Sequence, residues 1–288
     1  MEYKNLIKYG LSDRFAQEAT LYGGLFLARV TEQHRDLYRV ACENGEIRAG
    51  VSGNFIYRAN DNLDFPAVGD WVMIDRMDDS TGNAVIHHIL RRMSVFERKA
   101  AGTADSRQIV AANIDTVFLC MSLNADFNLR RLERYLSIAW NSMATPVIVL
   151  TKADLCDDLS SRLAELSKVN DRRRHAVPCD GEIAFRDVQE TKEIREDDGK
   201  GRHATTHRQL LVLPGGGIVI DTPGMRELQL DSANLSRSFE DIEELAEQCR
   251  FRDCSHTTEP DCAVRKAIEA GELPQERMEN YKKLRREM

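Results

Sequence analysis

The sequence predicts a multidomain α/β chain with an all-β N-terminus, a parallel α/β sheet in the middle and a helical C-terminus. Three observations predict this order. Short runs rich in β-branched and aromatic residues come first, two continuous apolar runs alternate with helical spacing next, and a cysteine-rich segment lies between helical stretches near the end. We place the three domains at residues 1–93, 94–236 and 237–288.

Residues 1–93 contain strand-like runs separated by Gly, Asn and Asp. The turn signals include NGE at 44–46 and DDSTGN at 78–83. Small strands at this spacing predict a barrel closed on itself, and we choose an OB-like barrel. An SH3-like barrel or a small sandwich is the alternative, because the number of runs does not separate these folds. The runs are LYGGLFLARV, RDLYRVAC, EIRAGVSG, NFIYRA, GDWVMID and NAVIHHIL.

The middle of the chain alternates apolar strands with helices. IDTVFLCMSL at 114–123 and PVIVLTKAD at 146–154 are continuous apolar runs, typical of strands buried on both faces. Helical spacing follows each run, over 129–143 and near 157–168. This order predicts a parallel sheet with crossover helices. RQLLVL, a PGGG turn and GIVIDT then predict a hairpin that feeds a third buried strand into the sheet.

Composition narrows the class of protein. Hydrophobic residues make up 42% and charged residues 30% of the chain, a balance that can bury a globular core. No apolar run is long enough to cross a bilayer and the start lacks an apolar signal core, so we expect a cytoplasmic protein without a membrane partner. The net charge of −7 excludes a uniformly basic nucleic-acid binder. Local basic clusters remain, each with a solvated face as the alternative: Arg91, Arg92, Arg98 and Lys99; Arg172, Arg173 and Arg174; Lys282, Lys283, Arg285 and Arg286.

The TKAD motif, Thr151 to Asp154, directly follows the second apolar run. The carboxylate of Asp154 can accept two hydrogen bonds from N1–H and the exocyclic amine of guanine, while the stem of Lys152 packs along the base. Surface polarity after a strand is the alternative, since Lys-x-Asp is a short pattern.

The DTPG motif, Asp221 to Gly224, ends the GIVIDT run. A carboxylate at a strand end can support Mg²⁺ through water, and the Gly224 amide can meet a γ-phosphate. The GRHATTHR stretch from Gly201 to Arg208 precedes it and offers a threonine hydroxyl to Mg²⁺. A plain turn and a polar loop are the respective alternatives.

The chain carries three motifs in the order TKAD, GRHATTHR and DTPGMREL. With this order it resembles the RsgA/YjeQ family of circularly permuted GTPases, which assist biogenesis of the small ribosomal subunit. The resemblance extends over nearly the whole chain. The resemblance implies a circularly permuted P-loop-GTPase-like sheet, GTP and GDP as ligands with Mg²⁺, GTP hydrolysis, and the small ribosomal subunit and its rRNA as partners. It implies guanine contacts from Thr151, Lys152 and Asp154; a switch threonine at Thr206, with Thr205 as the alternative; magnesium and γ-phosphate contacts from Asp221 and Gly224; and a catalytic histidine at His203. Thr151 stands where the family has Asn, and its hydroxyl offers fewer hydrogen bonds, so we expect weaker base affinity.

One motif of the family is missing. Gly-x4-Gly-Lys-[Ser/Thr] should lie between the TKAD motif and the switch loop, and no such match occurs in the 288 residues. Gly215–Gly217 is not followed by lysine, and Gly199-Lys200-Gly201 lacks a preceding strand. Because this loop supplies the amide cradle and the phosphate lysine, we expect a truncated sheet and impaired hydrolysis. The alternative function is a nucleotide-independent ribosome- or RNA-binding zinc protein, a non-hydrolysing relic of the family.

The C-terminal segment carries Cys249-x4-Cys254-x-His256-x5-Cys262. Three thiolates and one imidazole suit tetrahedral Zn²⁺ in a closed structural site, and the segment also resembles the zinc module of the same family. Buried thiols beside an exposed histidine are the alternative. A zinc-stabilised interaction scaffold without an RNA partner is a third function. We expect a monomer.

Overall fold

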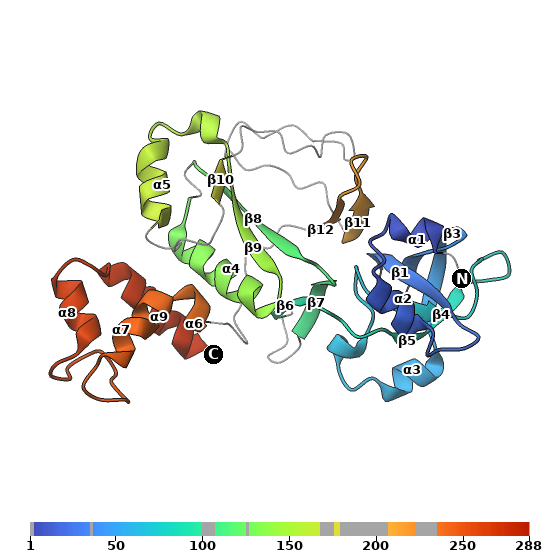
Figure 1. The fold of residues 1–288 in the computed structure, drawn as a ribbon, viewed down its shortest axis with the longest axis horizontal. Helices are drawn as coiled ribbons and strands as arrows, with labels where there is room; N and C mark the ends of the chain where they lie inside the picture. Colours follow the sequence, from blue (N-terminus) through green and yellow to red (C-terminus); the bar gives the residue numbers. More distant parts are fainter. Residues whose placement is uncertain are drawn as a thin grey trace. The chain divides into compact units, whose positions relative to one another are not determined.

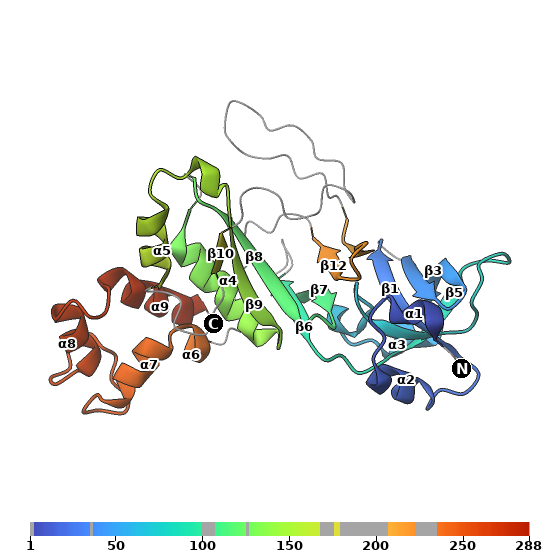
Figure 2. The ribbon, with the colours of Figure 1, turned by 45° about the horizontal axis from the view of Figure 1, so that its top comes forward.

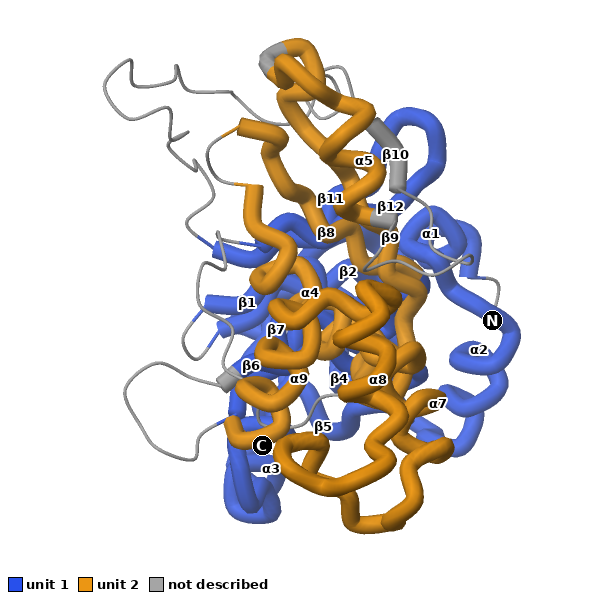
Figure 3. Tube along the Cα trace, turned by 90° about the vertical axis from the view of Figure 1, so that its left-hand side faces the viewer, with its two compact units in different colours: residues 1–115, 182–227 blue, residues 116–181, 228–288 orange. Residues whose placement is uncertain are grey.

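The computed structural model describes two compact units, each treated by itself. The first comprises residues 1–115 and 182–227, and the second comprises 116–181 and 228–288 (Figure 3). The described residues are 3–34, 37–99, 107–124, 127–167, 176–178, 207–222 and 235–287. Across them, no helix is both long and apolar enough to cross a membrane.

The first unit contains the predicted OB-like barrel (Figure 1). The strands run in the order β1-β2-β3-β5-β4, and β4 pairs with β1 to close the circle. β3 and β5 are parallel, and the other neighbours are antiparallel. Inward positions alternate with outward ones, so that Ile47 and Ala49 are buried while Glu46 and Arg48 are exposed. The bounds are β1 Phe26–Gln33, β2 Tyr38–Cys42, β3 Gly45–Val51, β4 Trp71–Ile74 and β5 Ala84–Ile89.

Short helices surround this barrel, and sequence patterning did not find them. Helices α1 (Lys4–Ile7) and α2 (Asp13–Ala19) pack Leu6 and Phe15 into a second apolar cluster around Trp71. The run NFIYRA, predicted as a strand, forms helix α3 (Gly53–Arg58), and that prediction is wrong. The Ser52 side chain accepts a hydrogen bond from the Phe55 amide and caps the helix, whose residues are all at least partly exposed. Helix η1 (Asn62–Asp64) follows.

Arg92, which belongs to the first of the predicted basic clusters, is not a simple solvated side chain. Arg92 donates from Nη2 to Asp70 Oδ2 at 2.7 Å, and the Asp70 side chain is fully buried. The guanidinium also donates to the carbonyl oxygens of Leu63 and Phe65, at 2.6 and 2.7 Å. Arg92 therefore ties the loop after α3 to the barrel, and we leave it out of any surface patch.

The predicted hairpin forms, but it joins a different sheet. β11 (Gln209–Val212) and β12 (Ile218–Asp221) are antiparallel and are joined by the glycine turn. β11 pairs with β1 at Glu32 and Gln209, so the hairpin extends the barrel sheet to seven strands. The expectation of a third strand in the parallel sheet is therefore wrong. The β12 side chains are only half-buried, which suits the edge of a sheet better than its centre.

The first unit also holds a two-stranded antiparallel sheet. Strand β6 (Val95–Lys99) pairs with β7 (Arg107–Ala112). Arg208, just before β11, donates to the Ile109 carbonyl at 2.8 Å and so connects this small sheet to the hairpin.

The second unit contains the predicted parallel sheet, in the order β10-β9-β8 (Figure 2). The bounds are β8 Thr116–Ser122, β9 Thr145–Thr151 and β10 Ala176–Pro178, with helices α4 Leu129–Asn141 and α5 Leu159–Ser167 between them and η2 Ala153–Leu155 after β9. β8 was expected to be buried on both faces, and this is wrong. Leu119 and Met121 are buried, whereas Phe118 is 56% exposed and Cys120 is also exposed. Strand β8 is therefore buried on one face only, whereas Ile148, Val149 and Leu150 of β9 are all buried, as expected for a strand covered on both faces.

Four helices complete the second unit: α6 Leu235–Ser238, α7 Glu240–Glu247, α8 Ala263–Glu269 and α9 Gln275–Glu287. Phe239, Ile242, Val264 and Leu284 form their apolar interior. A buried ion pair between Arg277 on α9 and Glu133 on α4 joins these helices to the parallel sheet's crossover helix. The cysteine-rich segment lies between α7 and α8.

Candidate metal centre and guanine-reading loop

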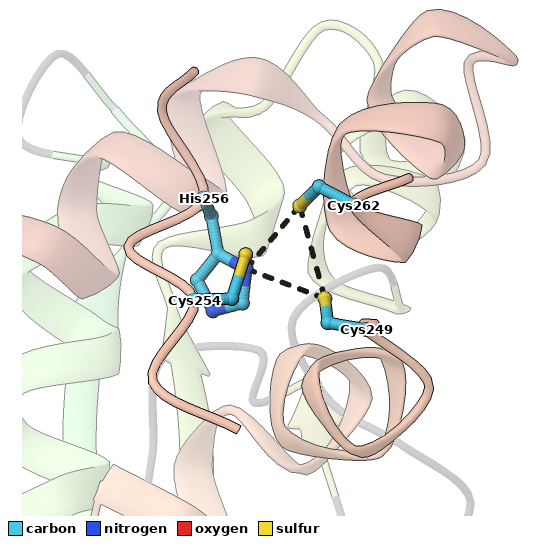
Figure 4. A group of neighbouring side chains, drawn as sticks. All are labelled: Cys249, Cys254, His256 and Cys262. Atoms are coloured by element: carbon cyan, nitrogen blue, oxygen red, sulfur yellow. Dashed lines mark hydrogen bonds between the residues drawn. The ribbon is translucent and has the colours of Figure 1, made fainter. Parts of the chain in front are cut away.

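The four predicted metal ligands come together in the second unit (Figure 4). Cys249 lies just after α7, Cys254 and His256 lie on the following loop, and Cys262 is the N-cap residue of α8. Their ligand atoms all lie within 4.8 Å of one another. The sequence spacing was sufficient to identify this set.

Three distances in the cluster, those among Cys249, His256 and Cys262, match the edges of a tetrahedral site. His256 Nδ1 lies 3.4 Å from Cys262 Sγ and 3.6 Å from Cys249 Sγ, and the two sulfur atoms are 3.8 Å apart. A tetrahedral zinc ion would set edges of about 3.8 Å between two sulfurs and about 3.5 Å between sulfur and nitrogen. The three cysteines and the histidine can therefore hold a metal ion of this kind.

The electrostatics of the cluster also favour a cation. Burial raises the pKa of the Cys254 thiol to about 11, and the neighbouring thiols of Cys262 and Cys249 add to this rise. Burial also acts on Cys249, but hydrogen bonds from the Val264 and Ala263 amides outweigh it and bring that pKa below its ordinary value. Three adjacent thiolates need a counter-charge, which a divalent ion supplies.

The surroundings of His256 favour its neutral imidazole, the form that binds a metal ion. Burial lowers its pKa, and the nearby Lys282 ammonium lowers it further. An imidazole must be unprotonated to bind a metal. Lys282 on α9 also donates from Nζ to the His256 carbonyl oxygen at 3.0 Å, so this lysine both favours the neutral ring and holds its loop.

The TKAD loop, which the sequence predicts to bind guanine, lies at the carboxyl end of β9, where ligands collect in parallel sheets. Thr151 is the last strand residue, and its carbonyl accepts a hydrogen bond from the Leu123 amide at 3.0 Å. Lys152 adopts the left-handed conformation, with φ 57°, which is unusual for a residue other than glycine. Asp154 is exposed. The backbone thus turns sharply after β9 and presents a carboxylate to solvent.

The DTPG aspartate belongs to a different sheet from the TKAD loop. Asp221 ends β12 and pairs with Gln209 in the first unit, whereas the TKAD motif belongs to the second. Among the described residues, no sheet contains both motifs. His203, Thr206 and Gly224, as well as the alternative Thr205, lie outside the described residues.

Sequence reasoning missed two residues that hold the metal loop, Glu259 within it and Lys282 on α9. Glu259 accepts hydrogen bonds from the loop backbone, and Lys282 donates to it. Glu259 lies inside the span of the four ligands, and that position was the only signal in the sequence. Lys282 stood out only as part of a basic cluster.

Comparisons with known proteins agree with this architecture. The RsgA GTPase family model matches residues 89–178 and 181–231. Small ribosomal subunit biogenesis GTPase RsgA 2 of Lactiplantibacillus plantarum is 46% identical over 99% of this chain and 89% of its own length. Small ribosomal subunit biogenesis GTPase RsgA 1 of Listeria innocua is 42% identical over 98% of this chain and 89% of its own length.

Solved structures give the same fold. YjeQ from Thermotoga maritima superposes with a TM-score of 0.62 and 26% identity, over 90% of this chain and 97% of that one. YloQ, a circularly permuted GTPase, gives a TM-score of 0.61 at 23% identity, over 92% of this chain and 97% of that one. The fold is thus that of circularly permuted GTPases. With the full-length identities above, the chain belongs to the RsgA GTPase family.

The same comparisons show that the chain is shorter than this relative over the aligned region. The alignment with the L. plantarum protein runs over 317 positions, which exceeds the 288 residues of this chain by 29. At least 29 positions of that alignment therefore have no residue here. The family match falls into two parts, one ending at 178 and the next starting at 181.

Proposed function

We propose that this chain acts in biogenesis of the small ribosomal subunit, by binding the subunit and its rRNA. The observation that carries the proposal is the 46% identity to a small ribosomal subunit biogenesis GTPase over 99% of the chain. The OB-like barrel supports it, because barrels of this type bind oligonucleotides on their strand surface and loops. The barrel near one end of the chain and the ligand cluster near the other are the two modules through which we propose that it docks.

We propose that Zn²⁺ is the metal of the C-terminal cluster. Cys249, Cys254, His256 and Cys262 would hold it, and all four positions are filled by protein. The ion would supply positive charge to the three thiolates and would link the end of α7, the loop and the start of α8. A closed four-ligand site of this kind is structural, because it leaves no position for a reacting water.

Guanine recognition rests on the TKAD loop. The exposed Asp154 carboxylate can accept both donors of the guanine edge, and Lys152, with Thr151 before it, lies on the adjacent backbone turn. By the family pattern, Asp221 and Thr206 would support Mg²⁺, Gly224 would meet the γ-phosphate, and His203 would orient the attacking water. We propose that GTP and GDP are selected over other nucleotides but bound weakly.

Hydrolysis is the step that this chain lacks the means to perform well. No Gly-x4-Gly-Lys-[Ser/Thr] match occurs in the sequence, and the family match divides where that motif is expected. The shortfall of at least 29 positions is long enough for a loop with its strand. Phosphoryl transfer depends on positioned charge around the phosphates, and each lost donor of this kind reduces the rate on the order of a hundredfold. We propose slow or absent GTP hydrolysis.

The second candidate function is nucleotide-independent binding to the ribosome. The pairing of β12 with β11, on the barrel side of the chain, favours it, because the two nucleotide motifs then lie in different sheets. In this case the protein would bind small subunits equally well with and without GTP.

Co-sedimentation of the zinc-loaded chain with small ribosomal subunits tests both candidates. We expect binding at low salt that weakens steeply as salt rises, since phosphate contacts release counterions. No co-sedimentation at low salt would contradict the ribosomal function. Equal binding with and without GTP would favour the nucleotide-independent candidate.

Nucleotide selection needs its own measurement. Titration with GTP and with ITP, which lacks the exocyclic amine of guanine, should show a preference for GTP. Asp154→Asn should abolish that preference, whereas Asp157→Asn, an exposed aspartate three residues away, should keep it. An equal affinity for the two nucleotides in the unmodified chain would contradict guanine recognition by the TKAD loop.

A further inference from the structure

One carboxylate organises the loop that carries two of the four metal ligands. Glu259 Oε1 accepts hydrogen bonds from the Ser255 amide at 2.9 Å and the Ser255 hydroxyl at 2.5 Å. Its other oxygen, Oε2, accepts from the amides of Thr257 and Thr258 at 2.9 and 3.1 Å. Both oxygens are therefore engaged with the backbone of a single loop.

These hydrogen bonds lie on either side of a metal ligand. Ser255 precedes His256 and Thr257 follows it, and Glu259 binds the amides of both neighbours through opposite oxygens. His256 has φ 56°, in the left-handed region, which is disfavoured for a residue with a Cβ. The Glu259 contacts compensate for this strained turn, and the turn directs His256 Nδ1 toward the sulfur atoms of Cys249 and Cys262.

A second contact holds the same residue from outside the loop. Lys282 on α9 donates to the His256 carbonyl oxygen at 3.0 Å. The amides beside His256 and its carbonyl are thus bound by side chains of opposite charge, one from the loop and one from a helix. This is the arrangement expected where backbone direction, and not the ligand side chain alone, decides whether the donor atoms converge.

We propose that Glu259 is a positioning residue for the metal centre, which fixes the loop from Cys254 to His256 in the ligating conformation. The inference rests on the metal site of the proposed function and adds a residue that does not itself bind the ion. A carboxylate accepts hydrogen bonds at both oxygens, whereas the amide nitrogen of glutamine accepts none. Glu259→Gln therefore removes the bonds at one oxygen and places a donor against backbone N–H groups.

The test measures metal affinity on the full chain. Zinc is titrated into metal-free protein in competition with a chromophoric chelator, for the unmodified chain, E259Q and the matched control E269Q. Glu269 lies on α8, where it forms an exposed pair with Arg265 at 3.6 Å. We expect E259Q to bind zinc about tenfold or more weakly, and E269Q to match the unmodified chain.

Cobalt substitution separates positioning from ligation. At saturating Co²⁺ the visible absorption of E259Q should match that of the unmodified chain, because the same three sulfurs and one nitrogen bind the ion. A changed cobalt spectrum at saturation would show that Glu259 alters the ligand set and would overturn the positioning role.

The other outcomes of the zinc titration also test the role of Glu259. Equal zinc affinity for E259Q and the unmodified chain overturns the inference and leaves the metal centre intact. An unmodified chain that binds no zinc overturns the metal centre itself, and the role of Glu259 with it. Should E259Q fail to fold, E259D replaces it: the shorter carboxylate reaches fewer of the loop amides, so its affinity should also fall, and an unchanged value overturns the proposal.

Discussion

Arg277 is the charged residue whose loss should disturb the second unit most. Its side chain is 6% exposed, and it donates to Glu133, whose side chain is 4% exposed. It also donates to Asp241 from Nε at 2.7 Å and Nη2 at 2.8 Å, and to the Ser238 carbonyl at 2.9 Å. Four elements, α4, α6, α7 and α9, therefore depend on one guanidinium.

Replacing Arg277 with Met leaves the buried Glu133 carboxylate without its cation. Breaking a buried pair on one side typically destabilises by about 3–5 kcal/mol. Asn280 on α9 still donates to Glu133, so we expect the lower part of this range, about 3 kcal/mol. The double variant Glu133→Gln, Arg277→Met should recover part of the loss, because the buried charge is then absent as well.

The loss of stability in Arg277→Met should also depend on pH, and the direction of this dependence follows from the pKa of Glu133. Burial raises the pKa of this carboxyl, and Arg277 is the leading opposing influence. Without Arg277 the folded-state pKa rises further above the unfolded value. Such a group favours the folded state when protonated, and that contribution is lost as pH rises through the folded pKa. The gap between Arg277→Met and the unmodified chain should therefore narrow as pH falls from about 7 toward about 5.

The assay uses the two tryptophans of the chain. Trp71 lies in the barrel and Trp140 on α4, so in a Trp71→Phe background the fluorescence of Trp140 follows urea unfolding of the second unit. The matched control is Arg265→Met, which removes an exposed pair with Glu269 and should change stability by less than about 1 kcal/mol. An Arg277→Met midpoint equal to that of the control would refute the reasoning.

Three further outcomes are expected. Cys254→Ser should lower bound zinc from one ion per chain, measured by elemental analysis, and should unfold the segment around α8, because metal binding and folding are coupled; full metal content in this variant would contradict the ligand set. Gly69→Ala should destabilise the barrel by more than about 1–3 kcal/mol, since φ is +95° and the new Cβ would lie 2.1 Å from the Ala112 carbonyl oxygen. Gly50→Ala, where no atom lies within 4 Å, is its control in urea unfolding followed by Trp71. Single-turnover GTP hydrolysis should be slow or absent with small subunits present, and stimulated turnover that Asp221→Ala abolishes would show that another loop holds the phosphates.

The parts of the fold that the sequence predicted are those set by local periodicity. Alternation along GEIRAGV places Ile47 and Ala49 in the barrel, and the helical spacing of Leu132 and Leu136 places α4 against the sheet. The metal cluster was also predictable, because four ligands within fourteen positions are close in space for almost any compact path of the chain.

Local pattern failed where a side chain or a cap decided between structures. NFIYRA has strand-forming composition, but Ser52 caps a helix there and no inner surface receives alternate side chains. Patterning also gave no sign of α1 and α2, whose few apolar residues are meaningful only beside Trp71. The role of Glu259 was invisible for a similar reason, because its partners are backbone amides that every residue possesses.

The position of β12 shows a different limit. An apolar run indicates that a strand is buried, but it does not indicate which neighbouring strand it pairs with. GIVIDT was assigned to the parallel sheet because β8 and β9 form that sheet and family order places DTPG beside them. In the described residues, β8 pairs only with β9, and β12 reaches β1 through β11. A phosphate-binding loop of this class follows a strand of its own. Because the motif is absent from the sequence, we infer that its strand, which would lie between β8 and β12, is absent with it. The short hairpin then has a ready partner in the barrel, where Gln209 donates to Glu32 at 3.0 Å. We infer that the absence of the motif from the sequence underlies both the slow hydrolysis that we propose and the pairing of β12 outside the parallel sheet.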